Sequence, residues 1–175
     1  MENNELQKRK RNRLKEFDYS SNGAYFITVC TKDRAKILSN ITVGDGALDV
    51  PKIKLTEYGK IVEKYIISTG KIKNVYVEQY VIMPNHIHMI IFIDNALFEY
   101  ENLKDGTSKA PSPTNETIPH IVSTLKRFCN KEIGGNIFQR SYHDHVIRNR
   151  EDYEEISKYI YENPINWETD EFYTK

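Results

Sequence analysis

The chain has 175 residues, and its 25 basic and 25 acidic side chains give a formal net charge of zero at neutral pH. This length can bury a core without disulfides or metal staples, so we expect residues 1–175 to form a single domain. Cys30 and Cys129 form no paired pattern, which excludes a secreted disulfide framework. No apolar segment approaches the roughly 20 residues of a membrane span, so we expect a cytoplasmic protein that has no membrane partner.

Charge is distributed unevenly along the neutral chain. The run KRKRNRLK occupies residues 8–15, whereas acidic residues gather towards the C-terminus. We expect residues 1–15 to be a basic, flexible arm. Such an arm fits contact with nucleic acid or another anionic partner, and a solvated tail that has no partner explains it equally well.

The first half of the chain alternates β-rich runs with one helical pattern. Strands are expected at 23–31, 74–83 and 86–93, a loose hairpin within 36–55, and a helix at 55–70. Thr56 is the expected N-cap of that helix, and Gly70 is its expected end. The strand at 86–93 is apolar on both faces, which is typical of a central strand that is covered on both sides.

The second half begins with a polar loop rich in Gly, Ser and Pro. This loop is expected at 105–117, followed by a helix from Ile118 to Ile133, a short strand at 137–148 and a helix at 149–163. Pro164 ends the last helix. The order β–α–β–β–α–β predicts an α+β, ferredoxin-like fold with an antiparallel sheet and an extra C-terminal helix. This fold hosts many functions, so it predicts none by itself.

Two histidines stand at the start of the central apolar strand. His86 and His88 are two residues apart, so they share a face of that strand and can both bind one divalent ion. An isolated His-x-His pair is more often satisfied by core packing. His143 and His145 form a second such pair, which is a rival metal site, a contributor to the first site or an exposed strand end.

The final helix adds a tyrosine beside an amide. Tyr159 and Asn163 are four residues apart, so their side chains lie on one helix face. This pairing suggests a nucleophile beside a metal ligand. Taken alone, a tyrosine at the edge of the apolar stripe is more often a packing residue.

Three motifs, MPNHIHMII, QRSYHDHVIRN and YIYENPINW, follow one another in this order after RNRLKEFDYSSNGAYFITVCTKDR. Together they resemble the REP-associated tyrosine transposases, which are HUH single-tyrosine endonucleases of small insertion sequences. The resemblance runs from about residue 9 to residue 167. It implies a ferredoxin-like core with the histidine strand at its centre. It also implies an enzyme that cuts and joins single-stranded DNA with Mg²⁺ or Mn²⁺.

The same resemblance implies roles for individual residues. His86 and His88 match the two metal-binding histidines, and Tyr159 matches the nucleophile that forms a 5′-phosphotyrosine. Asn163 stands where related enzymes place a polar third ligand, and Glu155 or His145 are alternatives for that position.

DNA binding is expected from basic residues that gather on one face of a chain of neutral net charge. The candidates are Lys8, Arg9, Lys10, Arg11, Arg13, Lys126, Arg127, Arg140, Arg148 and Arg150. The resemblance implies single-stranded DNA with hairpin or palindromic elements as the substrate. It favours a monomer over a homodimer.

Two other functions compete with this hypothesis. A ferredoxin-like module rich in aromatic residues can bind single-stranded nucleic acid without cutting it. A metallohydrolase could instead gather zinc between the two His-x-His pairs, although Asp144 would point to the opposite strand face.

Overall fold

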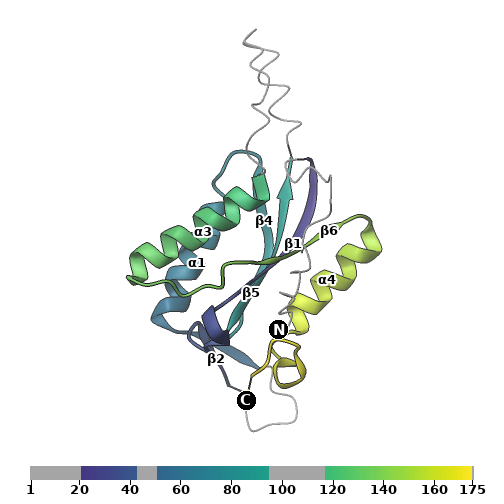
Figure 1. Cartoon of the computed structure of the whole chain (residues 1–175). Helices are drawn as coiled ribbons and strands as arrows, with labels where there is room; N and C mark the ends of the chain where they lie inside the picture. Colours follow the sequence, from purple (N-terminus) through teal and green to yellow (C-terminus); the bar gives the residue numbers. More distant parts are fainter. Residues whose placement is uncertain (1–20, 43–50, 95–116, 175) are drawn as a thin grey trace, which may run out of the picture.

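The computed structural model describes residues 21–42, 51–94 and 117–174. A four-stranded antiparallel sheet lies at its centre (Figure 1), in the order β4-β5-β1-β6. Its strands are β1 (Gly23–Cys30), β4 (Val75–Ile82), β5 (His86–Ile93) and β6 (His143–Ile147). This strand order confirms the predicted ferredoxin-like arrangement. The expected basic arm at 1–15 lies outside the described residues, and so does the loop expected at 105–117 except for Thr117.

Two helices cover one face of the sheet and a third lies against the other face (Figure 1). The first two are α1 (Glu57–Thr69) and α3 (Thr117–Ile133), and the third is α4 (Arg150–Glu162). The Asn149 side chain accepts a hydrogen bond from the Asp152 backbone N–H (2.8 Å), which caps α4. None of the described helices combines the length and the apolar character that crossing a membrane requires.

A two-stranded sheet precedes α1 and fixes where that helix begins. Its strands are β2 (Ser39–Thr42) and β3 (Lys52–Leu55), within the predicted hairpin region. Thr56 caps α1 as expected, because its Oγ1 accepts a hydrogen bond from the Gly59 N–H (3.1 Å). A Cβ at Gly59 would overlap the backbone carbonyl of Leu38, so the close approach of α1 to this segment requires glycine.

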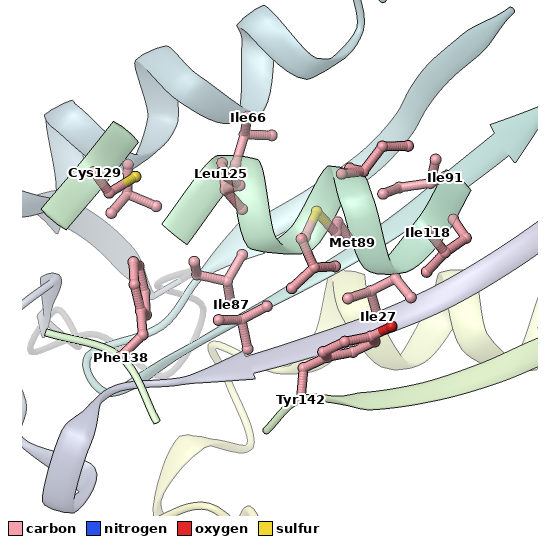
Figure 2. Close-up of a cluster of buried hydrophobic side chains, with 14 of the residues drawn as sticks. Ile27, Ile66, Ile87, Met89, Ile91, Ile118, Leu125, Cys129, Phe138 and Tyr142 are labelled. Atoms are coloured by element: carbon pink, nitrogen blue, oxygen red, sulfur yellow. The ribbon is translucent and has the colours of Figure 1, made fainter. Parts of the chain in front are cut away.

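Strand β5 separates the two faces of the molecule. Ile87, Met89 and Ile91 are fully buried beneath α1 and α3, where Figure 2 shows them packed with residues such as Ile118 and Leu125. Because side chains alternate along a strand, His86 and His88 point to the opposite face, which α4 covers. The hydrophobic core on one face therefore holds the histidine pair rigidly on the other.

The strand expected at 137–148 is shorter than the sequence suggests. Strand β6 begins only at His143, and Phe138 forms an isolated bridge with Thr31. The Lys126 ammonium donates hydrogen bonds to the backbone carbonyls of Gln139 (2.9 Å) and Ser141 (2.9 Å). A side chain from α3 thus satisfies groups that would otherwise need a neighbouring strand.

Candidate metal and tyrosine site

The two histidines and the tyrosine lie in one place. His86 and His88 are 0% and 1% exposed, and their ring centroids are 4.4 Å apart. Helix α4 places the Tyr159 hydroxyl 3.3 Å from Nε2 of His88. The Tyr159 side chain remains 38% exposed, so it forms the solvent-facing side of this group. The three residues that the resemblance singles out are therefore brought together.

A hydrogen bond to Nδ1 sets the tautomer of His86, and a second one allows the same tautomer for His88. Nδ1 of His86 lies 2.9 Å from Oδ1 of Asn85, and Nδ1 of His88 lies 2.8 Å from the Thr28 hydroxyl. Because an amide oxygen only accepts, Nδ1 of His86 carries the proton and Nε2 carries a lone pair. His88 takes the same tautomer when Thr28 accepts. Both Nε2 atoms are then ready to bind a metal.

Asp170 and Asn163 complete the polar cluster. Ligand atoms of His86, His88 and Asp170 all lie within 4.8 Å of one another. Asn163 is 1% exposed and directly follows α4, and its Nδ2 donates a hydrogen bond to Oδ2 of Asp170 (2.6 Å). Nε2 of His86 and Oδ1 of Asn163 are buried and have no hydrogen-bond partner among the described residues. These two atoms have unpaired lone pairs and lie beside a carboxylate. A divalent cation would bind such lone pairs and the carboxylate together.

The C-terminal segment covers the imidazoles. The ring centroid of Phe172 lies 4.8 Å from that of His86 and 5.7 Å from that of His88. Nδ2 of Asn85 donates to the Phe172 carbonyl (2.8 Å), and the Arg34 guanidinium lies 4.4 Å from the Phe172 ring centroid. This cover excludes water from the histidine side of the cluster.

Burial controls the protonation of the three groups. It lowers the pKa of His86 to about 4, although the Asp170 carboxylate acts in the opposite direction. Burial also lowers the pKa of His88 well below its usual value, and His86 adds to this effect. At neutral pH both imidazoles are therefore neutral, which is the form that binds metals. Burial and the neighbouring Asp170 raise the pKa of Tyr159, so the metal-free phenol stays protonated.

The alternatives for the third metal ligand, His145 and Glu155, do not belong to the cluster of His86, His88 and Asp170. Nε2 of His145 lies 2.9 Å from the Asp152 carboxylate, and Glu155 is exposed on α4. His143 is exposed, with its ring centroid 6.2 Å from that of Phe172. Within residues 21–42, 51–94 and 117–174, the one His/Cys/Asp/Glu cluster with metal-ligand spacing is that of His86, His88 and Asp170.

Asp170 is the residue that the sequence reasoning missed, because it was counted only as part of the acidic C-terminus. It lies just beyond the short 3-10 helix η2 (Trp167–Thr169), where the chain turns back towards α4. An acid shortly after the Asn-Pro pair that ends a helix was the one available signal.

The predicted DNA contacts are only partly described. Arg140 and Arg148 are exposed, whereas the Arg127 guanidinium lies 4.9 Å from the Phe128 ring centroid and Arg150 pairs with Glu154 (2.7 Å). Lys126 is engaged with backbone carbonyls, as described above. The basic residues between positions 8 and 13 lie outside the described residues. The DNA-binding roles of all these residues stay predictions.

The fold of this chain is similar to that of a solved tyrosine transposase. A solved structure of the REP-associated tyrosine transposase bound to a REP hairpin matches 93% of this chain and 74% of that chain, with a TM-score of 0.59 and 20% identity. The resemblance seen in the sequence is confirmed in the fold.

A protein of similar sequence shows to which family this chain belongs. A Haemophilus influenzae protein (strain ATCC 51907 / DSM 11121 / KW20 / Rd), described as an uncharacterized protein, is 32% identical over 171 residues. The match covers 92% of this chain and 91% of that protein. The chain belongs to the family of this Haemophilus influenzae protein. No family model matches the chain.

Proposed function

We propose that this protein is a metal-dependent transposase that nicks and joins single-stranded DNA, with Tyr159 as the nucleophile. One observation carries the proposal. The Tyr159 hydroxyl lies 3.3 Å from Nε2 of His88 and 3.0 Å from Oδ2 of Asp170, two groups of the candidate metal cluster. A nucleophile beside a divalent-ion site is the arrangement that phosphoryl transfer needs.

The residues that would hold the ion are His86 and His88 through Nε2, Asp170 through its carboxylate and Asn163 through Oδ1. The fit rests on the two orphaned acceptors, on His86 and Asn163, and on the neutral state of both imidazoles. Mixed nitrogen and oxygen ligands suit Mn²⁺, and Mg²⁺ is the alternative. A bound divalent ion supplies a Lewis acid that polarises a phosphate oxygen and offsets developing negative charge.

The side chains of the protein orient the attack. The Tyr159 hydroxyl donates its hydrogen bond to Asp170, which leaves an oxygen lone pair available for the phosphorus atom. A bond forms between the tyrosine oxygen and phosphorus while the bond from phosphorus to the 3′ oxygen breaks. The 3′ oxygen leaves as a hydroxyl, taking up the proton that the phenol loses. The 5′-phosphotyrosine keeps the bond energy, so a 3′-hydroxyl can later rejoin the strand without ATP.

The proposed substrate is single-stranded DNA next to a hairpin. This proposal is supported by the solved structure of similar fold, which is bound to a REP hairpin. The exposed Arg140 and Arg148 are suited to phosphate contacts. Hairpin-bearing strands are therefore the first substrates to test.

The test is formation of a covalent protein–DNA adduct in the presence of Mn²⁺. We expect the wild-type protein to form the adduct and Tyr159→Phe to abolish it. Tyr161→Phe is a matched control, because Tyr161 is on the same helix but 78% exposed, and it should form the adduct normally. An adduct that persists in Tyr159→Phe would disprove the assigned nucleophile. DNA binding in EDTA without cleavage under any metal would favour the binding module.

A further inference from the structure

A cavity of about 420 Å³ opens beside the Tyr159 phenol, on the solvent side of the candidate metal cluster. Its walls come from the end of α4 and from the turn around η2. The lining residues are Tyr159, Asn163, Asn166, Thr169, Asp170 and Glu171. Because Tyr159 itself lines the cavity, a DNA strand that presents a phosphate to its hydroxyl would lie next to the cavity.

The chemistry of the walls argues against a phosphate site. Among residues 21–42, 51–94 and 117–174, no lysine or arginine lines the cavity, whereas Asp170 and Glu171 contribute two carboxylates. Away from the proposed metal ligands, a phosphate group placed beside Glu171 would meet like charge. The walls instead offer two amides, a threonine hydroxyl and carboxylate oxygens, which suit a neutral ligand that donates N–H groups.

Two of the lining side chains are available for such a ligand. Asp170 and Asn163 are bonded to each other (2.6 Å), and Thr169 donates its hydroxyl to the Asn166 carbonyl (2.9 Å). The Asn166 amide and the Glu171 carboxylate are exposed and make no hydrogen bond or ion pair among the described residues. A carboxylate accepts from the amino group of a nucleobase, and an amide can pair with a base edge in two places.

We propose that this cavity binds the nucleobase next to the scissile phosphate and selects bases with an exocyclic amino group. Cytosine, adenine and guanine carry that group, and thymine does not. Glu171 accepts from the amino group, and Asn166 pairs with the adjoining ring edge. The phenol ring of Tyr159 forms a wall against which a base can pack. This inference rests on the proposed function and adds a specificity subsite to it.

The experiment uses hairpin-bearing single strands that carry each of the four bases at the nucleotides flanking the cut. The rate of adduct formation with Mn²⁺ is measured for the wild type, Glu171→Gln, Asn166→Ala and the control Glu168→Gln. Glu168 is exposed in the same turn but does not line the cavity. We expect the wild type to discriminate about tenfold or more against thymine at one flanking position. Glu171→Gln and Asn166→Ala should each lose most of that discrimination, and Glu168→Gln should keep it.

The outcomes separate the two proposals. Adduct formation that is indifferent to the flanking bases would overturn the subsite and leave the proposed function standing. Discrimination that survives in both Glu171→Gln and Asn166→Ala would overturn it as well. If no strand forms an adduct with the wild type, the proposed function fails, and the subsite fails with it.

Discussion

Asn85 connects the histidine pair to the segment that covers it, so its removal should weaken metal binding. Oδ1 of Asn85 accepts from Nδ1 of His86 (2.9 Å), and its Nδ2 donates to the Phe172 carbonyl (2.8 Å). Asn85→Ala removes both bonds from a side chain that is 0% exposed. The His86 ring then loses the bond that fixes its orientation and keeps the lone pair on Nε2.

The magnitude follows from these two bonds. Loss of the group that orients a metal-binding histidine lowers metal affinity by about 10- to 100-fold. The Phe172 carbonyl is also left without its donor, which costs about 1–3 kcal/mol of conformational stability. Metal affinity and unfolding free energy should therefore fall together in Asn85→Ala.

The assay is calorimetric titration with Mn²⁺ at neutral pH, accompanied by urea unfolding. Trp167 is the single tryptophan, and its ring centroid lies 5.9 Å from that of His86, so its fluorescence reports on the site. Ser39→Ala is a matched control, because the buried Ser39 hydroxyl donates its hydrogen bond to the Ile82 carbonyl (2.8 Å) and not to either histidine. It should lose stability but bind Mn²⁺ normally. Wild-type affinity in Asn85→Ala, or an equal loss in Ser39→Ala, would refute the reasoning.

Three further predictions concern stability and DNA binding. In the metal-free protein, His86 should contribute a loss of about 3 kcal/mol of unfolding free energy as the pH falls from about 6.5 to 4, because the unfolded chain binds a proton that folded His86, with its pKa of about 4, does not. His88, whose pKa is lowered as well, adds to the loss over the same direction of pH. Urea unfolding in EDTA should therefore show a flatter pH profile for His86→Gln than for the wild type. Gly59→Ala should cost about 3 kcal/mol by overlap with the Leu38 carbonyl, measured by urea unfolding, whereas Gly135→Ala meets no atom within 4 Å and should be nearly neutral. Lys126→Met should cost about 2 kcal/mol of stability and leave the salt dependence of DNA binding unchanged, since its ammonium bonds to backbone carbonyls; Arg148→Gln should reduce the salt slope by about 1.

Local patterns predicted the elements that build the site. The alternation along β5 placed His86 and His88 on one face, and the cap at Thr56 placed the start of α1 correctly. The spacing of Tyr159 and Asn163 predicted a shared helix face, and both side chains reach the same cluster. Periodicity and capping are properties of short segments, so one sequence suffices to read them.

Contacts between segments that are distant in the sequence could not be predicted from such local patterns. Asp170 and Phe172 reach the histidines only because the chain turns back after Pro164, and a turn of this kind has no periodic pattern. Asn85 lies between the strands expected at 74–83 and 86–93 and belongs to neither pattern, yet both ends of its amide are used inside the site. The late start of β6 depends on Lys126, which lies on a different element.

The position of Tyr159 within hydrogen-bonding distance of His88 in the same polypeptide has a kinetic consequence. Strand cleavage by a site whose groups all come from one chain would be first order in the protein–DNA complex, with a rate per molecule that does not change on dilution. The cleaved 5′ end would stay tethered to the molecule that cut it, while the 3′ end is held only by noncovalent contacts. Rejoining would then be a race between recapture of that 3′ end and its diffusion away, so the ratio of resealed to released product would depend on how long the hairpin stays bound.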